Sequence, residues 1–174
     1  HHEFLEGAPV TGMENTLGQY KIMREVGKGG MGIIYKALDP RTQKPVAIRV
    51  LPPTMVDRVT VERFHREVQA MVKLKHPNMI EVFDSGMEKG KHFLVMEFVE
   101  GENLKTAIKN QGALAAKRAL QIAAHIAHAL SHMHKQGMIH RDSTPANIMI
   151  APDGKVKVMD YGLVKMLGMT NVTV

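Results

Sequence analysis

Cysteine and tryptophan are both missing from this 174-residue chain, and aromatic residues make up only 5% of it. Without cysteine, the chain has no disulfide framework, no thiolate zinc site and no cysteine nucleophile. It also lacks any apolar stretch close to the roughly 20 residues that a membrane-spanning helix needs, so we expect this chain not to bind a membrane. These absences fit a cytoplasmic protein.

The balance of residue types is that of one globular domain or of two small lobes. Hydrophobic residues make up 44% and charged residues 23%, which argues against wholesale disorder. The 23 Lys and Arg residues outnumber the 17 Asp and Glu residues, and the net charge of +6 suits phosphate-bearing ligands. Because the basic residues are scattered along the chain, we expect no nucleic-acid partner.

The pattern of strands and helices predicts two regions after a leader. Residues 1–12, HHEFLEGAPVTG, are expected to be a tag or linker remnant. Short turns between consecutive strands favour an antiparallel sheet in the first region, residues 13–99, and one helix follows the third strand. The strands are expected at Tyr20–Val26, Ile33–Leu38, Pro45–Leu51, Met79–Ser85 and Lys91–Val99, and the helix at Thr60–Leu74.

The second region, residues 100–174, has a different character. Helices are expected at Asn103–Asn110 and at the alanine-rich Ala113–Gln136, which stops before a glycine. Short β-like runs follow within Met138–Ile150 and Lys155–Asp160, on either side of a Pro-Asp-Gly turn.

A glycine-rich segment, GKGGMG at residues 27–32, follows the first predicted strand. Glycines let a backbone approach phosphates closely, although such a segment alone is equally typical of a plain hairpin. It is followed by another strand pattern, IIYKA, whereas a dinucleotide-binding loop opens a helix. A Walker loop is also excluded, because no Gly-Lys-Ser/Thr is present.

Two later segments carry oxygen ligands. The segment HRDSTPAN at residues 140–147 contains an aspartate that can accept a proton and an asparagine that can bind Mg²⁺. The segment DYG at residues 160–162 offers a second metal-binding carboxylate. Mg²⁺ prefers a few protein oxygens combined with phosphate oxygens, which these segments would provide together. Each segment alone is also common as a loop with a satisfied aspartate.

The three segments occur in this order, with a VAIR strand between the first two, and this set resembles the protein kinase signature. The words GGMGIIYKA, LKHPN and LVMEFVEG are similar to those of bacterial-type (Hanks-type) serine/threonine protein kinases, over about Leu17 to Val164. The resemblance implies an α+β fold, with a five-stranded antiparallel N-lobe sheet and one helix, plus the first part of a helical C-lobe. It also implies transfer of the ATP γ-phosphoryl group to Ser or Thr of a protein.

The resemblance assigns a role to each matching residue. Asp142 would be the catalytic base, Arg49 would pair with Glu67, and Asn147 and Asp160 would bind Mg²⁺. Three glycines would cover the ATP phosphates: Gly27, Gly29 and Gly32. The residues implied around the adenine, including the hinge after the fifth strand, are Val26, Ile34, Ala47, Met96, Glu97, Val99, Met149 and Met159.

Two residues depart from the family pattern at phosphate-contacting positions. Arg49 replaces a lysine, and the longer planar guanidinium is not equivalent to a compact ammonium in a fitted site. Thr144 replaces the catalytic-loop lysine that contacts the γ-phosphate. Tyr161 in place of phenylalanine is a mild change. The resemblance therefore leaves two hypotheses: a kinase with weak or lost phosphoryl transfer, or a pseudokinase that acts as a nucleotide-binding or scaffolding module towards a protein partner.

Only residues 163–174 follow the DYG segment, so we expect the chain to end before the family's substrate-docking helices. Part of the long helix would then be uncovered, and an exposed apolar face favours self-association. That face contains Leu120, Ile122, Ala123, Ile126, Leu130 and Met133.

Three histidines, His125, His128 and His132, recur at spacings of three and four on the same predicted helix. Such spacing can gather imidazoles on a metal, but it is also typical of a polar helix face, which we favour.

Overall fold

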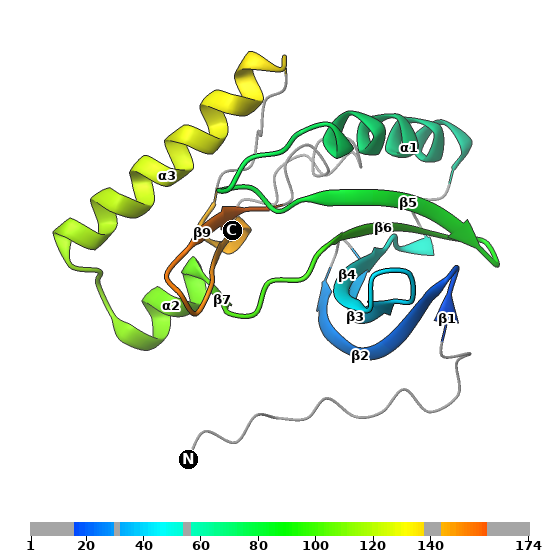
Figure 1. Cartoon of the computed structure of the whole chain (residues 1–174), viewed down its shortest axis with the longest axis horizontal. Coiled ribbons are helices and arrows are strands. Elements are labelled where there is room, and N and C mark those ends of the chain that lie inside the picture. Colours follow the sequence, from blue (N-terminus) through cyan, green and yellow to red (C-terminus); the bar gives the residue numbers. More distant parts are fainter. Residues whose placement is uncertain (1–15, 30–31, 54–56, 138–143, 160–174) are drawn as a thin grey trace. The chain divides into compact units, whose positions relative to one another are not determined.

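The computed structural model describes residues 16–29, 32–53, 57–137 and 144–159 (Figure 1). The predicted tag remnant, residues 1–12, lies outside them. The chain forms two compact units. One contains the residues up to Val61 together with Phe83–Phe98, and the other contains Glu62–Val82 together with the residues from Val99 onward.

The first unit is built on a six-stranded sheet in the order β1-β2-β3-β4-β6-β5. All pairings from β1 to β4, and that of β4 with β6, are antiparallel. The strands are β1 Thr16–Leu17, β2 Tyr20–Gly29, β3 Gly32–Asp39, β4 Lys44–Val50, β5 Val82–Glu88 and β6 Lys91–Glu97.

The sheet has six strands rather than the predicted five, because the two-residue β1 pairs with the start of β2, with Leu17 opposite Tyr20. The predicted strand at Met79–Ser85 also begins later, at Val82. Met79 instead forms an isolated parallel bridge with Val158, and both residues belong to the second unit.

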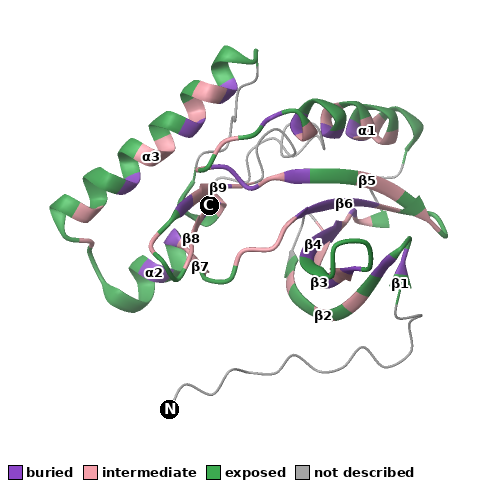
Figure 2. Cartoon of the chain, in the orientation of Figure 1, coloured by how far each residue is buried: buried purple, intermediate pink, exposed green. Residues whose placement is uncertain are grey.

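The hydrophobic core of the first unit lies against one face of this sheet. Figure 2 shows the buried residues along β4 and β6 in purple. Alternate residues of a strand point to opposite faces, and the register places Ala37 opposite Val46, and Ile48 opposite both Tyr35 and Val95. The buried members of the cluster are Leu17, Tyr20, Ala37, Val46, Ile48, Phe93 and Val95.

The helix α1, Arg58–Val72, begins two residues before the predicted start. The Asp57 carboxylate accepts a hydrogen bond from the Thr60 amide at 3.0 Å and thereby caps the first turn. Hydrogen bonds from Thr60 also lower the pKa of Asp57. The helix buries Phe64, Val68 and Met71, which recur at helical spacing.

The second unit also contains α2 Leu104–Gln111, α3 Ala116–Lys135, the short 3-10 helix η2 Pro145–Asn147 and a three-stranded sheet in the order β7-β8-β9. These strands are Glu102–Asn103, Ile148–Ile150 and Val156–Val158. The Asn103 side chain caps α2 by accepting a hydrogen bond from the Thr106 amide at 2.8 Å.

The helix α3 packs against β9 and buries part of its apolar face. Ile122, Ala129 and Met133 are buried, whereas Leu120 remains 71% exposed. Self-association through this face stays a prediction. Within the described residues, no helix is both long and apolar enough to span a bilayer.

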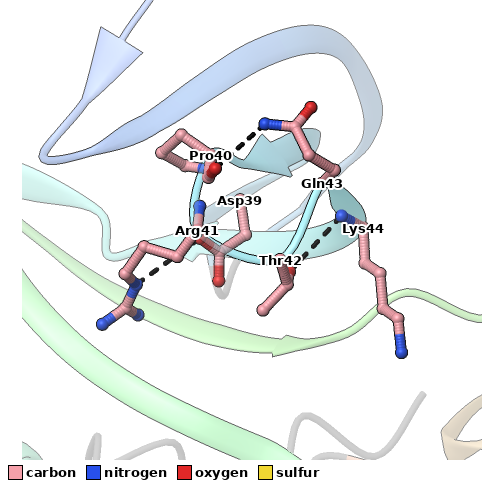
Figure 3. Close-up of polar contacts among 6 residues, drawn as sticks. All are labelled: Asp39, Pro40, Arg41, Thr42, Gln43 and Lys44. Carbon is pink, nitrogen blue, oxygen red and sulfur yellow. Dashed lines mark hydrogen bonds and ion pairs between the residues drawn. The ribbon is translucent and has the colours of Figure 1, made fainter.

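The turn between β3 and β4 is organised by Asp39, which is only 7% exposed (Figure 3). Its carboxylate accepts a hydrogen bond from the Arg41 amide at 2.9 Å and lies 3.6 Å from the Arg41 guanidinium. Its carbonyl accepts the Gln43 amide at 2.8 Å, and Gln43 adopts a φ of 56°. This turn sets the register of the two central strands.

We therefore expect Asp39→Ala to lower the free energy of unfolding by about 1–2 kcal/mol, because the turn loses its side-chain acceptor. Arg41→Ala is the matched control. It keeps the backbone donor and removes a guanidinium that is 65% exposed, with its ion pair to Asp39 and its hydrogen bonds to the Gln19 side chain, so its loss should stay below about 1 kcal/mol. Urea unfolding of both variants at neutral pH measures the difference, and equal losses would contradict this account.

Candidate functional site

The face of the sheet opposite the core gathers four of the residues singled out in the sequence. Ile34 on β3 is opposite Arg49 on β4, and Ala47 on β4 is opposite Met96 on β6. Ala47 and Arg49 are two residues apart, so all four side chains leave the same face. Three strands thus bring together residues that are far apart in the chain.

Arg49 is a charged residue in a buried position, with only 5% of its surface exposed. A guanidinium is costly to bury unless hydrogen bonds and opposite charges compensate for its lost hydration. Its position beside buried Ala47 and Met96 therefore marks a polar site inside an otherwise apolar surface. Glu67, its expected partner, lies half-buried on α1.

The glycine-rich segment joins β2 to β3, and the register pairs Gly27 with Ile34 and Gly29 with Gly32. The register shifts between Glu25 and Gly27, which places Val26 at an irregularity in the strand. The rest of the segment, residues 30–31, lies outside the described residues.

The two outer glycines of this segment have different environments. Gly32 has a φ of +102°, and a Cβ there would lie 1.8 Å from the Val50 carbonyl oxygen. At Gly27, a Cβ would meet nothing within 4 Å. The backbone therefore needs glycine at position 32 for structural reasons, whereas position 27 borders open space that a ligand could use.

The expected hinge runs from Glu97, the last residue of β6, to Val99, and both residues are half-buried. Between them, the Phe98 ring lies under the ammonium of Lys36, 4.5 Å from Nζ to the ring centroid. Lys36 is opposite Ala47 and so shares the face of the candidate site. Lys36 was not among the residues predicted from the sequence, although its place two residues after Ile34 was a usable signal.

In the second unit, backbone hydrogen bonds fix Asn147 at the end of η2. Its amide donates to the Thr144 carbonyl and its carbonyl accepts the Met159 amide, both at 2.9 Å. These bonds tie Asn147 to Met159, the last described residue of the chain. Met149 is half-buried on β8, opposite Lys157 of β9. Asp142 and Asp160 themselves lie outside the described residues.

Comparison with known families decides what this set of elements is. The profile of the protein kinase domain matches residues 20–173. The chain belongs to the protein kinase family. The recognition made from the sequence motifs, and the kinase-like fold that it implied, are confirmed.

Relatives of this kinase-family chain include several bacterial serine/threonine kinases. It is 40% identical over 157 residues to the serine/threonine-protein kinase PrkC of Bacillus subtilis, covering 90% of this chain and 24% of that protein. It is 36% identical over 162 residues to PknA of Mycobacterium tuberculosis, covering 90% and 38%. The chain thus spans about a quarter of PrkC and well under half of PknA.

Solved structures agree with this assignment. The PknI kinase domain of Mycobacterium tuberculosis superposes with a TM-score of 0.79 at 28% identity, over 88% of this chain and 64% of that one. Rad53 in complex with AMP-PNP gives a TM-score of 0.74 at 30% identity, over 83% and 38%. ATP binding is what the family leads one to expect.

The two glycine environments give a direct test. Gly32→Ala should destabilise the protein by about 2 kcal/mol or more, because it combines a left-handed φ with a backbone collision. Gly27→Ala, the same chemical change in open space, should alter stability by less than about 1 kcal/mol. Thermal unfolding measures the stability of both variants. Similar losses of stability at the two positions would contradict the geometry described here.

Proposed function

We propose that the chain is a serine/threonine kinase-like domain that binds ATP with Mg²⁺ and transfers the phosphoryl group weakly or not at all. The observation that carries this proposal is the buried Arg49 on the site face of β4. At that place the family pattern has lysine, whose ammonium contacts the nucleotide phosphates.

The difference between the two cations is one of shape as well as reach. The guanidinium is longer and planar, and its donors form a rigid fork that matches a carboxylate in two-point contact. Arg49 is therefore better suited to two-point contact with a carboxylate than to contacting two phosphate groups at once. This favours a site that keeps its architecture while losing electrostatic stabilisation of the transition state.

Thr144 adds a second loss of the same kind. It is exposed immediately before η2, and its hydroxyl offers no positive charge to a phosphoryl group in transfer. Removing one preorganised electrostatic contact typically costs on the order of 10²–10³ in rate, and losses within one catalytic unit need not add.

Nucleotide binding would depend mainly on residues other than Arg49 and Thr144, and these residues favour binding that is retained. The apolar side chains of Ile34, Ala47 and Met96 share one sheet face, where an adenine ring could pack against them. The Asn147 side chain provides a hard oxygen ligand of the type Mg²⁺ prefers, and Asp160 would provide the second. Bound Mg²⁺ would neutralise phosphate charge, and Asp142 would orient the attacking hydroxyl.

A scaffolding role towards a protein partner, or self-association, is the second candidate. Leu120 of α3 is 71% exposed, which favours a contact at that point of the helix. This candidate needs no nucleotide, so a binding measurement separates the two.

Calorimetric titration with ATP, with and without Mg²⁺, is the deciding experiment. We expect binding that strengthens when Mg²⁺ is present, and Asn147→Ala should remove most of that strengthening. Asn110→Ala, at an exposed position of α2, is the matched control and should titrate like the parent. A folded parent protein that binds no ATP under either condition would favour the scaffolding role instead.

Restoring both lysines tests the proposed cause of weak transfer. Arg49→Lys combined with Thr144→Lys should raise autophosphorylation with labelled ATP by on the order of 10²-fold or more. Arg41→Lys combined with Thr42→Lys makes the same two changes in the exposed β3–β4 turn and should leave the rate unchanged. Equal rates in parent and both variants would show that the two lysines are not what limits transfer.

A further inference from the structure

A histidine that the proposed function does not use joins three segments of the second unit. His76 lies in the turn between α1 and β5, and its ring centroid is 5.2 Å from that of His132 on α3, with the ring planes at 40°. His128 lies one helical turn before His132, on the same side of α3. The sequence placed these two histidines on one helix face but gave no sign that His76 would meet them.

The hydrogen bonding of His76 defines its neutral tautomer. Its Nδ1 accepts a hydrogen bond from the Asn78 amide at 3.0 Å, so Nδ1 carries no proton and the ring hydrogen is on Nε2. A second proton can enter only at Nδ1. Protonation of His76 would therefore replace an acceptor with a donor that faces the Asn78 N–H group.

The same turn holds β9. The Asn78 side-chain amide donates to the Val156 carbonyl at 3.1 Å, and the Val158 amide donates to the Asn78 carbonyl at 2.8 Å. The Ile80 amide donates in turn to the Val158 carbonyl at 2.9 Å. Both α3 and β9 are thus anchored at the turn that His76 stabilises.

We propose that His76 is an acid-sensitive contact at this junction. Uptake of a proton at Nδ1 removes the acceptor of the Asn78 amide and places a positive charge beside His128 and His132, which loosens the turn together with the ends of α3 and β9.

The charged groups around His76 support the proposal that its protonation is unfavourable in the folded state. From α3, His132 and His128 both act on it, and their positive forms disfavour its protonation. On its own segment, Lys73 is exposed and Lys75 is 3.5 Å from Glu81, so that carboxylate already faces a cation. From β9 the charged residue is Lys157, which lies between buried Val156 and Val158 and so leaves the opposite face of the strand.

Burial, and then the charges of His132 and His128, lower the pKa of His76 below its ordinary value near 6.5. In the unfolded chain the pKa returns to about 6.5, so the unfolded state takes up the proton more readily than the folded state. The contribution of His76 to stability is complete above about pH 6.5 and is lost as the pH falls through the lowered value.

A metal site is the other use of clustered imidazoles. Among the residues that the structure describes, no group of three histidine, aspartate or glutamate side chains is arranged to hold an ion.

The test uses the whole chain and two matched variants. We expect urea unfolding to give a lower ratio of folded to unfolded protein at pH 5.5 than at pH 7.5. The decrease should be smaller in His132→Gln, because that variant removes one of the charges that lower the pKa of His76. His134→Gln is the control, because His134 is exposed on the same helix, and it should follow the parent. A parent that shows no such loss, or a loss that is the same in both variants, would overturn the proposal.

A second measurement stands even if a variant folds poorly. In NMR of the parent, His76 should titrate below the ordinary imidazole pKa of about 6.5, and the Asn78 amide signal should move with the same midpoint as His76. Titration of His76 at or above its ordinary pKa, or an Asn78 amide that does not respond, would also overturn it.

Discussion

The antiparallel register of β3, β4 and β6 is the constraint on which the candidate site depends. It sends Ile48 and Val95 into the core and Arg49 and Met96 to the opposite face. A slip of one residue would exchange the two faces of a strand, which would place a guanidinium among apolar side chains at a cost of several kcal/mol. The hydrophobic core therefore selects the register, and the register assembles the site.

Long periodic segments and ordered motifs were predictable from the sequence. The apolar spacing within α1 and α3 led to helices within three residues of those observed, and the ordered kinase motifs led to the family. The two-residue β1 was missed because so short a strand carries no alternation. The Lys36–Phe98 and His76–His132 contacts were missed because each joins residues that only tertiary folding brings together.

Under the proposed function, the exchange of lysine for Arg49 would alter phosphoryl transfer and spare nucleotide binding. Burial on a sheet face limits the directions its side chain can take, so the fork of its donors cannot adapt to a new partner as a surface arginine could. Packing of an adenine against Ile34, Ala47 and Met96 would need only apolar surface, which the register provides regardless of the cation. In the proposed function, binding and transfer would therefore depend on different physical features of the same three strands.

In the second unit, the turn at Asn78 is the constraint on which the surrounding elements depend, as the strand register is in the first unit. It holds β9 through two backbone hydrogen bonds and one side-chain hydrogen bond, and β9 leads directly to Met159, whose amide donates to Asn147. The same turn contacts α3, after which the chain continues into the segment that contains Asp142. Because β9 is held at this turn and leads to Met159, opening of the turn would also loosen the hydrogen bond between Met159 and Asn147. Stability at His76 is in this sense a condition for the site, although no atom of His76 belongs to it.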